Sequence, residues 1–226
     1  LPWALIVCIF PVFGLTLYFL FSQNKLSRKL RRKHNSLAKE YVNTCTLCQE
    51  TFNGKLPQYL ISVANAPAFC DTAVTYFPFG EEMFVSLLAD LRRAEKFIFL
   101  EFFIIEPGKM WNSILEILRE KAANGVDVRV LYDDIGCASH LKNNYYQKLR
   151  KMGICAHKFN PFVPVITGIH NNRDHRKIVV IDGEIAYTGG VNLADEYINE
   201  KHPFGKWKDS AVRIEGSAVN NFTVLF

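Results

Sequence analysis

The chain has 226 residues, of which 49% are apolar, and a formal net charge of +5. This length allows one ordinary domain with a sizeable core, and the apolar content excludes an intrinsically disordered chain. The charge is unevenly distributed: residues 25–33 include six basic residues and no acid, so the rest of the chain sums to about −1 (5 − 6). The basicity belongs to one short stretch and does not indicate a nucleic-acid-binding surface.

Residues 1–21 contain no charged residue, and about 20 apolar residues suffice to cross a bilayer. We expect a transmembrane helix here, because Pro11 and Gly14 are tolerated in a spanning helix and Trp3 and Tyr18 lie near its ends. A signal peptide is the alternative, but the run is too long and its positive charges follow rather than precede it. The basic stretch behind it predicts a cytoplasmic C-terminal part and can attract anionic lipid.

Residues 22–58 are interpreted as a basic juxtamembrane connector. Short helices are expected within it at residues 36–43 and just after it at 59–64. Within it, Cys45 and Cys48 have the spacing of half a zinc site. A structural zinc site needs four ligands, and the chain has no second close cysteine pair. Isolated thiols in a reducing compartment are therefore favoured over zinc.

From residue 81 onward, helical and strand patterns alternate, closed by Gly and Pro signals. The expected segments are helices at residues 81–91, 111–122 and 141–152 and strands at 97–105, 126–132 and 154–159. Such alternation implies right-handed crossovers. It predicts an α/β domain at residues 59–226, with a mixed, largely parallel sheet flanked by helices.

A further strand is expected at residues 175–181, followed by the hairpin signal Asp182-Gly183 and an antiparallel return over 184–188. A short helix at 192–198, a strand at 211–214 and a helix from residue 218 complete the pattern.

The strand at residues 175–181 carries the chemistry. Because side chains alternate across a strand, His175 and Lys177 should point to the same side, on a strand that is buried on both faces. A buried Lys is costly unless an anion meets it, and a phosphate is the obvious anion. An imidazole can attack phosphorus and leave again, which divides one difficult step into two.

The pattern H-x-K-x4-D continues after Asp182 with Gly189, Gly190 and Asn192. A Lys ammonium and an Asn amide can hold phosphate oxygens whose charge grows in the transition state. Glycines after a strand let backbone N–H groups approach those oxygens. Asp182 lies on the opposite face by parity and heads a hairpin turn, so a structural role is favoured while a catalytic one stays open.

This constellation resembles the HKD motif of the phospholipase D superfamily. Residues 173–183, 187–197, 207–209 and 213–216 are similar to bacterial cardiolipin synthases, and the apolar run at 1–21 is similar to the second of that family's two membrane helices. The sequence Asp133-Asp134-Ile135-Gly136 fits as well, so the resemblance covers nearly the whole chain.

The resemblance implies a role for each matching residue. His175, Lys177 and Asp182 form the catalytic motif, with His175 as the nucleophile or its acid/base partner. Lys177 and Asn192, with Gly189 and Gly190, would bind the substrate phosphate. Asp209 would orient the histidine.

Glu101, a lone charge within an apolar strand, is a candidate for the rim of the site, and a structural role is an equal alternative. No metal and no cofactor are expected.

Members of the family carry two such motifs, whose histidines meet between two similar halves, and this chain carries one. We expect it to be the N-terminal half of a longer protein or to pair with a second copy, and to be poorly active alone. The resemblance implies a membrane-bound phosphatidyltransferase of the bacterial cell membrane, with its catalytic part on the cytoplasmic side. It would convert two phosphatidylglycerol molecules into cardiolipin and glycerol through a phosphohistidine. Its partners would be phosphatidylglycerol and anionic membrane lipid.

Two alternatives remain. The first is a hydrolase of the same superfamily, either a phospholipase D or a homodimeric nuclease; the near-neutral charge outside residues 25–33 disfavours binding to nucleic acid. The second is an inactive, membrane-tethered binding module.

Overall fold

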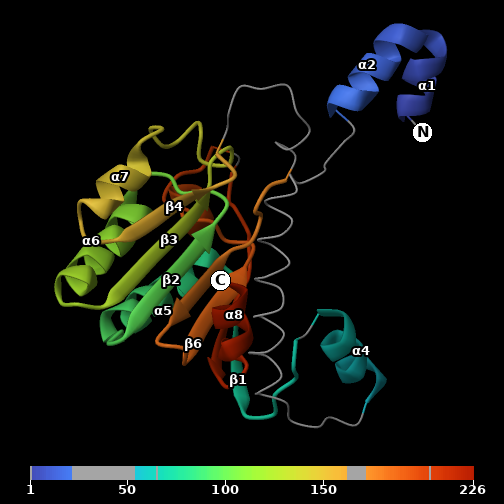
Figure 1. Ribbon diagram of the computed structural model, residues 1–226. Coiled ribbons are helices and arrows are strands. Elements are labelled where there is room, and N and C mark those ends of the chain that lie inside the picture. The colour runs from blue at the N-terminus through green and yellow to red at the C-terminus, as the bar shows by residue number, and fades with distance from the viewer. Residues whose placement is uncertain (1, 22–53, 65, 162–171, 204) are drawn as a thin grey trace.

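The structure is a computed structural model that describes residues 2–21, 54–64, 66–161, 172–203 and 205–226. Seven strands form one sheet in the order β1-β7-β6-β5-β2-β3-β4, and helices cover both of its faces (Figure 1). The mixed α/β class predicted from the sequence is therefore confirmed. The strands are β1 (Thr72–Phe77), β2 (Phe97–Phe102), β3 (Asp127–Asp133), β4 (Cys155–Phe159), β5 (Ile178–Ile181), β6 (Ile185–Gly189) and β7 (Ala211–Gly216).

The prediction of a largely parallel sheet is wrong. Only the β2–β3 and β3–β4 pairs are parallel, whereas β5 pairs antiparallel with β2, and β6, β7 and β1 continue antiparallel. The reason is the connection after β4. The chain enters β5 at the end of the sheet where β4 finishes, so β5 runs back in the opposite direction.

The helices divide the core into two layers. α5 (Gly80–Arg93), α6 (Lys109–Ala123) and α7 (Tyr145–Arg150) pack on one face, where Leu87, Trp111 and Leu149 join the larger cluster of buried side chains. α8 (Val219–Leu225) packs on the other face, where Val219 meets Ile178. Strand β5 is buried on both faces, as predicted, because its alternate side chains enter different clusters.

The hairpin predicted at Asp182-Gly183 is confirmed. It joins β5 to β6, and both turn residues have positive φ, 56° for Asp182 and 75° for Gly183. Two successive residues with positive φ give a turn whose twist matches the twist of the flanking strands. Strand β1 was missed by sequence reasoning, because it is an edge strand whose residues are mostly exposed and show no alternation.

The N-terminal part differs from the expectation of one helix over residues 1–21. Two shorter helices, α1 (Pro2–Ile9) and α2 (Pro11–Phe21), are separated at Phe10, because Pro11 lacks the N–H that would continue the helix. No helix among the described residues is both long and apolar enough to span a bilayer.

α4 (Lys55–Ala64) confirms the short helix expected at 59–64 and begins within the predicted connector. The helix expected at 36–43 and the pair Cys45 and Cys48 lie outside the described residues.

Candidate active site

Apart from Asp182, the predicted site residues lie at or near the end of the sheet where β2, β3 and β6 finish and β5 and β7 begin. The register shows this directly: Glu101 of β2 lies opposite Ile178, the first residue of β5, and Gly189 of β6 lies opposite Ala211, the first residue of β7. His175 and Lys177 precede β5, so the chain carries both into this end of the sheet.

His175 and Lys177 share one neighbour, the ring of Phe103. The His175 and Phe103 ring centroids are 4.8 Å apart, and Lys177 Nζ lies 5.5 Å from the Phe103 centroid and donates a 2.8 Å hydrogen bond to the His175 carbonyl. The prediction that both side chains share a side is therefore confirmed. The prediction that both residues are buried is wrong for His175. Lys177 is 6% exposed, whereas His175 is exposed, because the strand begins only at Ile178.

The buried ammonium of Lys177 has carboxylates near it. Burial holds the pKa of Lys177 below its usual range, and the negative charges of Asp209 and Asp174 act in the opposite direction. A further anion next to Nζ would stabilise the charged form of Lys177. The arrangement of an exposed imidazole beside a buried cation suits nucleophilic attack on a group that carries negative charge.

Asp209 lies close to the glycines that follow β6. Its Oδ1 accepts a hydrogen bond from the Ser210 N–H, and its carboxylate lies so close to Gly190 that a Cβ there would collide with it. None of the hydrogen bonds found in the described part of the chain joins Asp209 to His175. That Asp209 orients the histidine therefore stays a prediction.

The two glycines have a packing role in the structure. A Cβ on Gly189 would lie 2.4 Å from the Ser210 carbonyl, and Gly189 has φ +156°, which side chains disfavour. The Gly190 N–H donates to the same carbonyl at 3.0 Å. These contacts require glycine even without a ligand, and phosphate binding by these residues stays a prediction.

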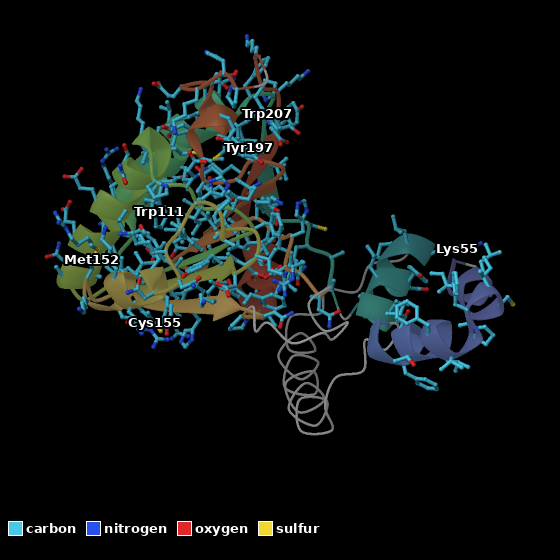
Figure 2. The ribbon with its side chains drawn as sticks, turned by 90° about the horizontal axis from the view of Figure 1, so that it is seen from above. Lys55, Trp111, Met152, Cys155, Tyr197 and Trp207 are labelled. Atoms are coloured by element: carbon cyan, nitrogen blue, oxygen red, sulfur yellow. The ribbon has the colours of Figure 1, made fainter. Side chains whose placement is uncertain are left out.

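Asn192 joins two loops behind the site. Its Oδ1 accepts from the Ile104 N–H at 3.0 Å, and its Nδ2 donates to the Tyr197 hydroxyl at 2.9 Å. Tyr197 lies in the 3₁₀ helix η2 (Asp195–Ile198) and packs against Trp207, as Figure 2 shows. Nδ2 has a second hydrogen, which is the one that could bind a phosphate oxygen; this role also stays a prediction.

Asp182 lies at the opposite end of β5 from His175. Its carboxylate accepts 2.8 Å hydrogen bonds from the backbone N–H groups of Glu95, Lys96 and Phe97, which form the turn between α5 and β2. The contacts give Asp182 the structural role that its parity and turn position favoured.

Glu101 is 1% exposed and lies beneath the segment that carries His175, so the structure does not place it at an open rim. Its Oε1 is 2.6 Å from Nη2 of Arg176. Burial, followed by the hydrogen bond and negative charge of Asp174, raises the pKa of Glu101 to about 8, although Arg176 acts to lower it.

Three site residues escaped sequence reasoning. Phe103, between His175 and Lys177, was read as an ordinary strand residue. Cys137 supports it: its buried Sγ accepts from the Ile105 N–H at 3.2 Å and donates to the Phe103 carbonyl at 3.4 Å. Asp133 accepts from the Asp174 N–H at 3.0 Å. The one signal in the sequence for Asp133 was the acidic pair Asp133-Asp134 at the end of a predicted strand.

The remaining histidines have other partners. His140 Nδ1 lies 2.8 Å from Glu106 Oε2, and His157 on β4 contacts Arg150. His170 lies outside the described residues. Within the residues that the structure describes, no group of three or more His, Cys, Asp or Glu side chains could hold a metal ion.

Comparisons with known proteins agree with this geometry. A family model described as "Cardiolipin synthase, PLD-like domain" matches residues 87–214. An uncharacterized protein of Streptococcus mutans is 41% identical over 238 residues, which cover 100% of this chain and 51% of that protein. Cardiolipin synthase 2 of Staphylococcus epidermidis is 34% identical over 244 residues, which cover 99% of this chain and 49% of that protein.

Among solved structures, phosphatidylserine synthase of Haemophilus influenzae is similar in fold, with a TM-score of 0.52 at 16% identity over 67% of this chain and 35% of that one. The chain spans about half the length of the curated relatives it matches. Because the family model covers more than half of the chain, and His175 and Lys177 of the motif meet at Phe103, the chain belongs to the phospholipase D superfamily, in its family of cardiolipin synthase domains.

Proposed function

We propose that this chain is one half of a phosphatidyltransferase of the cardiolipin synthase type, with His175 as its nucleophile. The observation that carries the proposal is the pairing of an exposed imidazole with a buried ammonium on one aromatic ring. The exposed ring can reach phosphorus in a lipid headgroup, and Lys177 can stabilise the charge on the phosphate oxygens.

The reaction has two displacements. In the first, an imidazole nitrogen of His175 attacks phosphorus of phosphatidylglycerol, the bond from phosphorus to the terminal glycerol oxygen breaks, and glycerol leaves with a proton from a general acid. In the second, a glycerol hydroxyl of another phosphatidylglycerol loses its proton to a base and attacks the same phosphorus. The P–N bond then breaks, which releases cardiolipin and restores the imidazole.

The general acid that protonates the leaving glycerol is not assigned to a residue of this chain. One His-x-Lys motif provides one histidine, and we propose that the second comes from another half, either in a longer chain or in a second copy.

Membrane attachment belongs to the same proposal, because the lipid substrates stay in the bilayer. α1 and α2 expose large apolar side chains, among them Ile9, Val12 and Phe13. α4 exposes Leu56, Tyr59, Leu60 and Val63, spaced as one apolar helix face. We propose that residues 1–21 anchor the chain and that the domain lies on the cytoplasmic side of the bacterial membrane.

The test is an assay of cardiolipin formation from phosphatidylglycerol in vesicles, with the chain provided together with its second half. His175→Ala should abolish product, and His202→Ala, an exposed histidine far along the chain, should not. If His175→Ala still formed cardiolipin, the role of His175 would be wrong.

A hydrolase of the same superfamily is the second candidate. Water can reach an exposed His175 and resolve the same phosphohistidine by hydrolysis. The same assay separates the two functions: phosphatidic acid in place of cardiolipin indicates a phospholipase D, and cleavage of added DNA without lipid turnover indicates a nuclease.

A further inference from the structure

The segment that carries His175 has no regular secondary structure. Residues 172–177 precede β5 and take part in none of the strand pairs. Side chains must therefore hold this segment in place, because ladder hydrogen bonds do not. Since the reacting imidazole sits in the middle of it, whatever fixes the segment also fixes the nucleophile.

One anchor is Asp133, at the end of β3. It is fully buried, and its Oδ2 accepts from the Asp174 N–H at 3.0 Å while its Oδ1 lies 3.2 Å from Nη1 of Arg173. The two residues before His175 are thus attached to the end of a buried strand.

A second anchor lies on the other side of the segment. Arg176 Nε and Nη2 contact both oxygens of Asp174, at 2.9 and 3.3 Å, and Nη2 also lies 2.6 Å from Glu101 on β2. His175 and Lys177 face Phe103, whereas Asp174 and Arg176 face Glu101. The segment is therefore held by two buried carboxylates, Asp133 at the end of β3 and Glu101 on β2.

Charge balance explains why Glu101 belongs to this group. Glu101 and Asp174 are both buried, and one guanidinium cannot neutralise two carboxylates. Burial and Asp174 together raise the pKa of Glu101 to about 8. Burial acts to raise the pKa of Asp174 as well, but hydrogen bonds to Glu101 and Arg176 and the charge of Arg176 together lower it. The raised pKa favours the uncharged form of Glu101, which leaves Asp174 as the carboxylate that faces Arg176 and Lys177.

We propose that Glu101, Asp174 and Arg176 form a positioning network that holds the His175 imidazole against Phe103 for attack on phosphorus. The inference rests on the proposed function of His175, but the network acts through the segment and not by touching substrate.

The chain offers a matched control. Arg213 makes a similar pair with the buried Asp90, at 2.7 Å, in the middle of the sheet and away from His175. Arg176→Gln and Arg213→Gln each remove the cation that lies nearest to a buried carboxylate, so both should lower stability. Only Arg176→Gln should displace the His175 imidazole from its contact with Phe103.

The first readout is independent of activity. In the full chain in detergent micelles, an NMR nuclear Overhauser effect between the ring protons of His175 and Phe103 reports their contact. We expect it in the wild type, in Arg213→Gln and in Glu101→Gln, which keeps an uncharged group of the same shape. We expect it to be lost in Arg176→Gln and Glu101→Ala.

The second readout is kinetic, in the complete protein. Arg176→Gln and Glu101→Ala should lower kcat by about 10- to 100-fold with KM changed less than about 3-fold, as for partners that orient a reacting group. Glu101→Gln should restore most of kcat.

Three results would overturn the inference. The first is an Arg176→Gln variant that loses stability as Arg213→Gln does but keeps both the ring contact and kcat. The second is a raised KM with the ring contact intact, which would make Arg176 a substrate-binding residue. The third is a ring contact that survives in Glu101→Ala. A lost contact in a protein whose wild type makes no lipid product would instead refute the proposed function and leave the network standing.

Discussion

At the scale of single residues, the two basic side chains of the site differ in solvent exposure. His175 is exposed and Lys177 is buried although only Arg176 separates them, and both lie next to the ring of Phe103. In the proposed reaction the imidazole must be open to a lipid phosphate, whereas the cation interacts more strongly with an anion in a site with less water. An aromatic ring can support both, because its face attracts a cation and its edge packs against an imidazole.

Glu101 leads to a prediction on pH. Its pKa is raised from 4.5 to about 8 in the folded chain, mainly by burial and then by Asp174. Between these values the unfolded chain loses the proton that the folded chain keeps, so stability is fully present below about pH 4.5 and falls until about pH 8. The slope is at most about 1.4 kcal/mol per pH unit. Denaturant unfolding from pH 4 to 9 should show this fall in wild type and not in Glu101→Gln.

The control for this prediction is Glu184→Gln, because Glu184 is an exposed carboxylate. It should follow the wild-type profile, and the histidines, present in all three proteins, cancel in the comparison. Parallel profiles for wild type and Glu101→Gln would show that folding does not shift the pKa of Glu101.

At the scale of elements, Asp182 fastens the β5–β6 hairpin to the turn between α5 and β2. Three backbone N–H groups share its carboxylate, and hydrogen bonds to a charged group each contribute about 1.5–3 kcal/mol when they are well desolvated. Here two of the three are exposed and contribute little, so the part-buried bond from the Phe97 N–H supplies most of the stabilisation.

Asp182→Ala should therefore lower the free energy of unfolding by about 2–3 kcal/mol, which includes the cost of placing Ala at positive φ. Asp182→Asn, which tolerates positive φ and keeps one acceptor, should lose less. Glu184→Ala, in the same turn but bound only by an exposed ion pair, should change stability by less than about 1 kcal/mol. Urea unfolding measures all three. An Asp182→Ala variant of normal stability that lacked lipid transfer would instead make Asp182 a catalytic residue.

At the scale of the whole molecule, the candidate site residues other than Asp182 lie at one end of a single sheet, and the chain spans about half the length of its curated relatives. A general acid contributes about 10²–10⁴-fold to such reactions. We therefore expect the 226-residue chain alone to form cardiolipin at least about 100-fold more slowly than the cardiolipin synthase of Staphylococcus aureus in the same vesicles.

The concentration dependence of this rate is informative. A rate per chain that rises with protein concentration indicates that two copies pair their histidines. A rate equal to that of the longer enzyme and independent of concentration would contradict the need for a second histidine.

Sequence alone predicted the candidate site residues and most of the elements. These features are local patterns: the spacing of His175, Lys177 and Asn192, the hairpin at Asp182, and the alternation of helices and strands. A local pattern can be read from the sequence without knowing which distant segments pack against it. The odd spacing between His175 and Asp182 also predicted that the two side chains lie on opposite faces of the strand.

Tertiary structure decided what depends on contacts between distant segments. The direction of β5 follows from where its connection enters the sheet, and the exposure of His175 follows from where the strand begins. Phe103 and Asp133 became site residues only because β2 and β3 end beside the segment that precedes β5. The charge of Glu101 is likewise set by its depth of burial and by Asp174, two properties that arise only when strands far apart in sequence pack together.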